Sequence, residues 1–204
     1  MPAEGSIHII DDDEAVRESL DFLFDSAGLA VRIHESAPAF LETLDPMRTS
    51  CIVTDIRMPD MSGMELLREL RARGVEAPVI VITGHGDVPL AVEAMRAGAY
   101  DFLEKPFDDE RLLDVVRAAV ESRTASHGTN EQTAARAKVA RLSQRERQVL
   151  KGLIEGRLNK TIAFDLGISA RTVEVYRAKL MAKMEANAFA DLVRMALLAG
   201  DLDV

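Results

Sequence analysis

Residues 51–63 read Cys-Ile-Val-Thr-Asp-Ile-Arg-Met-Pro-Asp-Met-Ser-Gly, and this stretch decides the fold. A short apolar, β-branched run ends at Asp55, as is typical of a buried strand. A polar loop containing Pro59 follows the run. Ser62 then stands three residues before Glu65, which is the pattern of a capping box at a helix start. The stretch therefore predicts a strand, a loop and a helix in that order.

The same alternation recurs on both sides of this unit. We expect strands at 7–10, 31–33, 52–54, 79–83 and 101–103, and helices at 14–27, 37–44, 63–73, 87–97 and 109–121. Five successive strand–helix units predict an α/β domain with a doubly wound, five-stranded parallel sheet. We assign residues 1–121 to this domain.

The remaining chain has a different character. Residues 122–141 are rich in Ser, Thr, Ala, Gly and charge, so we interpret them as a linker whose second half is helical without being part of a core. From residue 142 a new apolar periodicity predicts helices at 143–154, 159–166, 170–184 and 188–199. Residues 142–204 are therefore predicted to form an all-α domain.

Composition and charge narrow the class of protein. The 204 residues are 48% apolar and contain one cysteine and four scattered histidines, so a zinc site is not expected. Residues 1–121 carry a net charge of −14, whereas 142–204 carry +2, a division typical of a metal-binding or catalytic unit joined to a nucleic-acid-binding one. No apolar run approaches the roughly 18 residues of a membrane helix, and we expect a cytoplasmic protein without membrane contact.

Chemically active residues follow the predicted strands of the first domain. Asp11 and Asp12 follow the first strand, Asp55 ends the third, Thr83 ends the fourth and Lys105 follows the fifth. Ligands of such sheets bind at the carboxyl ends of the strands. Clustered carboxylates 4 Å apart repel by about 4 kcal/mol per pair at an effective dielectric of 20, so a cation must offset them. Mg²⁺ fits best, because it prefers oxygen ligands and commonly joins carboxylates to phosphate.

Asp55 is the best candidate for a phosphoryl acceptor, since a carboxylate can attack a phosphoryl group to form an aspartyl phosphate. Lys105 and the metal ion would neutralise the phosphoryl oxygens. One alternative is a phosphoester hydrolase in which this adduct is only an intermediate. A second is a DNA-binding protein whose first domain is vestigial.

These motifs resemble the receiver domain of bacterial response regulators, with a flavodoxin-like fold, over about residues 5–121. The resemblance rests on four stretches, which are 9–13, 55–63, 83–87 and 105–107. It implies that Asp11, Asp12, Asp55 and the backbone carbonyl of Arg57 hold Mg²⁺. It also implies that Asp55 is phosphorylated and that Thr83 and Lys105 bind the phosphoryl oxygens. Phe102 would be the aromatic switch residue, and the peptide bond between Lys105 and Pro106 would be cis.

The second domain contains the pattern of a helix-turn-helix. Ala163 and Gly167 supply a small residue and a turn that allows positive φ, and Ser169 can cap the next helix. Between 171 and 183 that helix carries four basic residues and one acid, which suits insertion into a major groove. An ordinary solvated amphipathic helix is the alternative.

Residues 142–199 resemble the LuxR-type DNA-binding domain of the NarL and FixJ regulators. The resemblance implies DNA contacts by Lys160, Arg171, Thr172, Glu174, Val175, Arg177, Ala178 and Lys179. The chain as a whole resembles the FixJ-type regulators, which act in nitrogen fixation. It would then take its phosphoryl group from a FixL-like sensor histidine kinase, bind double-stranded promoter DNA and activate transcription with RNA polymerase. We expect a regulator and not an enzyme in the usual sense.

Phosphorylation is expected to produce a homodimer. Thr83 directly precedes the helix at 87–97, and Lys105 directly follows the strand at 101–103. The site is therefore linked to the face formed by that helix, that strand and the helix at 109–121. Inward rotation of Phe102 would reshape this face and drive dimerisation.

Overall fold

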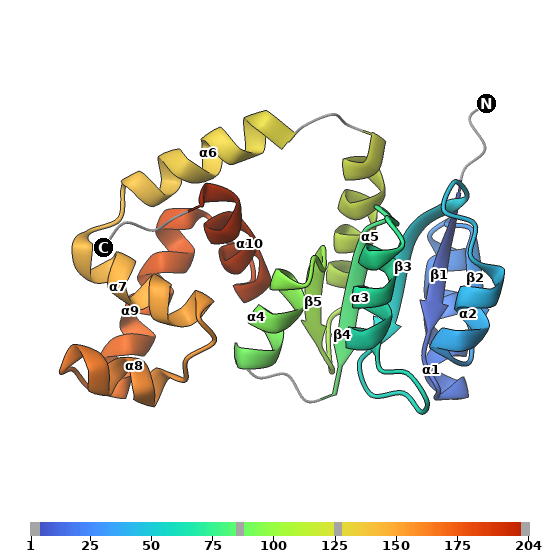
Figure 1. The fold of residues 1–204 in the computed structure, drawn as a ribbon, viewed down its shortest axis with the longest axis horizontal. Helices are drawn as coiled ribbons and strands as arrows, with labels where there is room; N and C mark the ends of the chain where they lie inside the picture. Colours follow the sequence, from blue (N-terminus) through green and yellow to red (C-terminus); the bar gives the residue numbers. More distant parts are fainter. Residues whose placement is uncertain (1–4, 85–87, 125–127, 201–204) are drawn as a thin grey trace. The chain divides into compact units, whose positions relative to one another are not determined.

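The computed structural model describes residues 5–84, 88–124 and 128–200. Five parallel strands form one sheet in the order β2-β1-β3-β4-β5, with a helix between successive strands (Figure 1). The strands are β1 (Ser6–Ile10), β2 (Val31–His34), β3 (Thr49–Asp55), β4 (Val79–Thr83) and β5 (Asp101–Glu104). The chain winds one way from β1 to β2 and the other way from β3 onward, so the carboxyl ends of β1 and β3 form the switch point. The predicted doubly wound α/β sheet is confirmed.

Helices cover both faces of the sheet (Figure 1). They are α1 (Glu14–Ser26), α2 (Ala37–Thr43), α3 (Gly63–Ala72) and α5 (Asp109–Thr124), and α4 (Val88–Arg96) follows β4 in the chain. One face packs against α1 and α5, where Ile9, Phe24, Leu112 and Val116 are fully buried in a common core. Because successive residues of a strand point to opposite faces, His8 lies on the face away from this core.

The helix starts follow the chemistry read from the sequence. The side chain of Asp13 accepts hydrogen bonds from the backbone N–H groups of Ala15 and Val16 at the start of α1. Ser62 and Glu65 form the predicted capping box at the start of α3. These caps satisfy N–H groups that have no partner inside the helix.

The C-terminal part of the chain is helical, as predicted. Its helices are α6 (Gly128–Ala140), α7 (Gln144–Ile154), α8 (Asn159–Leu166), α9 (Ala170–Met184) and α10 (Phe189–Ala199). Val149, Leu150 and Val173 are fully buried in the core that α7 to α10 share. Gly167 ends α8 in the left-handed region at φ 63°, so the turn has the conformation that the sequence predicted.

The predicted linker differs from the sequence-based expectation in its packing. Its second half forms α6, and this helix does pack against the C-terminal core, contrary to the prediction. Ala135 is buried, and Val139 packs against the core. The Arg136 guanidinium donates to the backbone oxygen of Ala199 at 3.1 Å, and Lys138 pairs with Glu185 at 3.0 Å. Ala135 and Val139 are too few to form an apolar stripe, so the sequence did not indicate this packing.

The chain divides into two compact units. One contains the sheet with α1, α2, α3 and α5, and the other contains α4 together with α6 to α10. The boundary of the first domain at residue 121 stays a prediction. Among the residues described, no helix has the length and apolar character needed to cross a membrane.

Candidate functional site

The acidic site lies at the carboxyl ends of β1, β3 and β5. Asp11 follows β1, Asp55 ends β3, and Lys105 follows β5. Nζ of Lys105 lies 2.9 Å from Oδ2 of Asp11 and 2.9 Å from Oδ1 of Asp55. The two carboxylate side chains are 5% and 11% exposed. The parallel sheet thus joins three side chains that are as much as 94 residues apart in sequence.

Lys105 is held in its charged form. Burial by itself disfavours the ammonium ion, but hydrogen bonds to Asp55 and Asp11 outweigh this cost and raise the pKa of Lys105 above its ordinary value. One ammonium group beside two carboxylates leaves a net negative charge among the three side chains. The site can therefore accept a further cation.

The other predicted site residues differ in how exposed they are. The side chain of Asp12 is exposed, and the backbone N–H of Arg57 donates to Oδ2 of Asp55 at 2.5 Å. Thr83 is fully buried at the end of β4, and its carbonyl accepts the backbone N–H of Lys105 at 2.7 Å. Residues 85–87, which complete the motif that begins at Thr83, lie outside the described residues.

The donor set fits Mg²⁺ in part. Within the described ranges, no group of three or more His, Cys, Asp or Glu side chains is arranged to hold a metal ion. Lys105 bonds to both Asp11 and Asp55, whereas the side chain of Asp12 is exposed. Mg²⁺ needs only one or two carboxylates, because waters and a phosphate complete its octahedral shell. Two buried carboxylates with a backbone carbonyl nearby therefore remain a suitable set.

Gly63 shapes the loop beside the acceptor candidate. A Cβ atom at position 63 would lie 2.1 Å from the backbone oxygen of Asp55, closer than any side chain can approach. The N–H of Gly63 donates to the carbonyl of Ile56 at 3.0 Å, which closes the loop. Asp60 adopts a positive φ of 65° within it. Gly63 therefore allows α3 to begin directly against the end of β3.

Two features that the family resemblance implied can be compared directly. The peptide bond between Lys105 and Pro106 is cis, as expected. The ring of Phe102 is already buried, with 9% of the residue exposed. The structure therefore does not show the exposed ring from which an inward rotation would start.

The second candidate site is the exposed side of α9. The Ser169 side chain caps this helix by accepting the N–H of Thr172 at 3.0 Å. Val173, Leu180 and Met184 are fully buried, which fixes the opposite side toward solvent. That side carries the residues of α9 predicted to contact DNA. The exposed ones are Arg171, Glu174, Val175, Ala178 and Lys179. Lys160, on α8, is also exposed. Thr172 and Arg177 are half-buried.

A buried acid at the start of α7, Glu146, bonds to α9 in addition to its predicted place in a capping box. Glu146 caps α7 together with Ser143 and also accepts a hydrogen bond from Nζ of Lys183 at 2.7 Å. Burial raises the pKa of Glu146, but the bonds from Lys183 and Ser143 dominate, so its pKa is below the ordinary value. Lys183 therefore ties α9 to α7, and its charge is neutralised.

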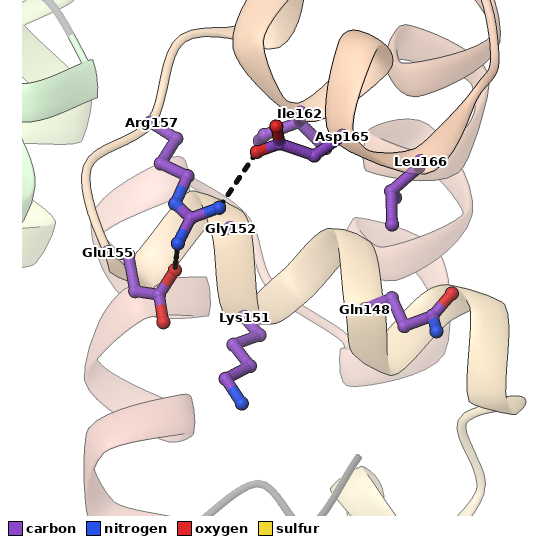
Figure 2. A pocket seen from close by; sticks show the side chains of 8 residues that line it. All are labelled: Gln148, Lys151, Gly152, Glu155, Arg157, Ile162, Asp165 and Leu166. Carbon is purple, nitrogen blue, oxygen red and sulfur yellow. Dashed lines mark hydrogen bonds and ion pairs between the residues drawn. The ribbon is translucent and has the colours of Figure 1, made fainter.

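A pocket lies between α7 and α8 (Figure 2). Arg157 pairs there with Glu155 at 2.9 Å and with Asp165 at 2.8 Å. A Cβ atom on Gly152 would lie 2.8 Å from Cγ1 of Ile162, so the glycine allows the two helices to pack closely there. The sequence-based prediction concerned the crossing of α8 and α9, with Ala163 and Gly167, and did not include this contact between α7 and α8.

Comparisons with known proteins agree with both sites. Residues 7–117 match the family described as "Response regulator receiver domain", and residues 140–196 match "Bacterial regulatory proteins, luxR family". The chain is 60% identical to the transcriptional regulatory protein FixJ of Azorhizobium caulinodans, over 98% of this chain and 95% of that protein. It is 50% identical to FixJ of Bradyrhizobium diazoefficiens over the full length of both.

A solved structure gives the same result. The fold is similar to that of full-length FixJ from B. japonicum, with a TM-score of 0.56 and 50% identity over 97% of this chain and 98% of that one. The two family matches together cover most of the chain in the same order as the two sites. The chain therefore belongs to the two-component response regulators that join a receiver domain to a LuxR-type DNA-binding domain, and among them to those of the FixJ type.

Proposed function

We propose that this regulator accepts a phosphoryl group on Asp55 from the phosphohistidine of a FixL-like sensor kinase. The observation that carries the proposal is the position of Lys105, 2.9 Å from the carboxylates of both Asp11 and Asp55. A carboxylate oxygen of Asp55 attacks the phosphorus, and the bond from phosphorus to the kinase imidazole nitrogen breaks. The ammonium group of Lys105 can then stabilise the negative charge on the phosphoryl oxygens.

Asp11, Asp12, Asp55 and the carbonyl of Arg57 are the residues that would hold Mg²⁺. When bound, the ion supplies positive charge beside the phosphoryl oxygens. The Thr83 hydroxyl, at the end of β4, is the group we assign to a phosphoryl oxygen. The chain thus catalyses only its own phosphorylation and slow dephosphorylation, and we do not assign it an enzymatic function on a separate substrate.

The output is proposed to be transcription control in the cytoplasm. Phosphorylated chains form a homodimer, which brings two copies of α9 to adjacent major grooves of promoter DNA about one helical turn apart. The dimer then activates transcription with RNA polymerase. The identity to FixJ proteins supports nitrogen-fixation genes as the targets.

Labelling with an acyl phosphate donor and Mg²⁺ tests the first step. Wild type should take up one phosphoryl group per chain, and Asp55→Asn should take up none. Stoichiometric label on Asp55→Asn would move the acceptor to another residue. Selection of duplexes from a random DNA library, with and without the donor, tests the second step. Equal enrichment in both arms would mean that phosphorylation does not control DNA binding.

A further inference from the structure

The cationic side chains around α9 have different kinds of partner. Lys183 is paired with Glu146 at 2.7 Å, and Arg157 is paired with both Glu155 and Asp165. Each of these carboxylates holds a cationic side chain in place and also neutralises its charge. Side chains of this kind offer little net attraction to a phosphate.

Arg177 is held in another way. Its Cζ atom lies 5.1 Å from the centroid of the Phe189 ring, within the range of a cation–π contact. Its Nη1 atom donates to the side-chain oxygen of Asn159 at 3.4 Å. Over residues 5–84, 88–124 and 128–200, no carboxylate forms an ion pair with Arg177. The guanidinium is therefore positioned without losing its net charge.

An aromatic ring can hold Arg177 in place without neutralising its charge. Arg177 belongs to α9, whereas Phe189 is the first residue of α10 and Asn159 the first residue of α8. Three helices thus fix one guanidinium at the edge of the exposed side of α9. A guanidinium has five N–H donors, and the contact with Asn159 uses only one of them. The remaining donors suit a phosphate, which binds arginine through paired hydrogen bonds.

A second cation of α9 has the same kind of support. Nζ of Lys179 lies 5.7 Å from the ring centroid of Tyr176. Both residues of α9 that lie against aromatic rings, Arg177 and Lys179, are among the predicted DNA contacts. Lys183, which is held by a carboxylate, was not among the predicted contacts.

We propose that Phe189 and Asn159 are positioning residues that set DNA affinity by holding Arg177 ready for a backbone phosphate. The proposal rests on the DNA binding given under "Proposed function". Holding the side chain in place before binding reduces the entropy lost when the contact forms. Because phosphate contacts carry no base information, Phe189 is expected to affect affinity and its salt dependence and to leave base preference unchanged.

A double-mutant cycle on the full-length phosphorylated protein tests this, using wild type, Phe189→Leu, Arg177→Ala and the double variant. The probe is a duplex recovered from a random library by the phosphorylated wild type. Loss of the cation–π contact should weaken binding of Phe189→Leu by about two- to fivefold. In the Arg177→Ala background the same change should have no effect. Phe189→Tyr keeps a ring face and should restore wild-type affinity.

The salt dependence gives a readout that a purely structural role would not change. Arg177→Ala should reduce the slope of log affinity against log salt by about 0.9, the value for one phosphate contact. If Phe189→Leu is unfolded by circular dichroism, Asn159→Ala takes its place in the cycle. Equal weakening in both backgrounds would overturn the proposal and leave Phe189 a packing residue. If wild type binds no duplex in any condition, the proposed function itself fails and the inference falls with it.

Discussion

The pH dependence of receiver stability depends on a buried pair of histidines between β1, β2 and α2. His8 is 3% exposed, and its Nδ1 lies 2.9 Å from Nε2 of His34. The two rings stack at 5.1 Å, and Phe40 packs edge-on against both. The Thr49 hydroxyl lies 3.4 Å from Nε2 of His8. One ring nitrogen of this pair must accept the hydrogen bond that the other ring donates, so at least one of the two rings must be neutral.

Acidification should therefore destabilise the receiver. Burial, and next to it the charges of His34 and Arg32, lower the pKa of His8 from its ordinary 6.5 to about 4. Burial also lowers the pKa of His34. A group whose pKa is lower in the folded state stabilises the fold above its unfolded pKa, and this contribution is lost as the pH falls. The loss begins as the pH falls below 6.5 and is complete near the folded pKa of His8.

The size of the effect follows from the two pKa values of His8. One pKa unit corresponds to about 1.4 kcal/mol, so the full penalty for protonating His8 is about 3 kcal/mol. Between pH 7.5 and pH 5 the expected loss of unfolding free energy is about 2 kcal/mol. That is a large part of the about 5 to 15 kcal/mol that holds a typical domain folded.

Two measurements on the full-length protein check this. The imidazole proton signals of His8, followed by NMR, should stay in their neutral positions down to pH 5. The free energy of unfolding, measured in urea, should fall between pH 7.5 and pH 5. In His8→Gln it should fall by less, because His34 is then the one histidine of the pair that titrates. Titration of His8 near 6.5, or an unchanged pH dependence in His8→Gln, would refute the reasoning.

Three further changes have definite expected outcomes. Gly63→Ala should destabilise the receiver by about 1 to 3 kcal/mol or more, because its Cβ would clash with the backbone of Asp55 at 2.1 Å, and urea unfolding measures the loss. Glu146→Gln should destabilise the C-terminal helices by about 1 kcal/mol through loss of the bond to the half-exposed Lys183, measured by thermal unfolding beside the surface control Glu155→Gln. Wild type should dimerise in sedimentation with an acyl phosphate donor, whereas Asp55→Asn should remain monomeric. A phosphorylated wild type that stays monomeric while it binds its duplex would exclude this route.

The sequence was sufficient for the order and type of the elements. Strand β4 begins and ends as predicted, because Val79 to Thr83 is a continuous β-branched run between turn signals. Strand β3 begins at Thr49, three residues earlier than predicted, because polar residues there pair with β1 and no alternating pattern marks them. Pairing with a neighbouring strand thus extends an element beyond its own local signal.

The contacts that cross between elements were less predictable. The strand ends correctly indicated that Asp11, Asp55 and Lys105 would meet, because parallel topology fixes where strand ends lie. Nothing local to residue 189 indicated that its ring would lie against Arg177, since the contact depends on how α10 packs on α9. The close approaches at Gly63 and Gly152 were likewise invisible, because a glycine in sequence does not show which atom lies opposite it.

On the proposed function, the burial of Phe102 changes where the switching energy must come from. Moving a two-state equilibrium from 1:99 to 99:1 requires about 5.5 kcal/mol of differential affinity between the states. The ring is buried in the structure, so burial of its apolar surface contributes little of that difference. Lys105 now bridges Asp11 and Asp55, and a phosphoryl group on Asp55 adds negative charge within reach of its ammonium group. The differential contact therefore has to lie in the re-pairing of Lys105 and the Thr83 hydroxyl. Both residues are joined through the backbone hydrogen bond from Lys105 to Thr83, which links the end of β4 to the end of β5.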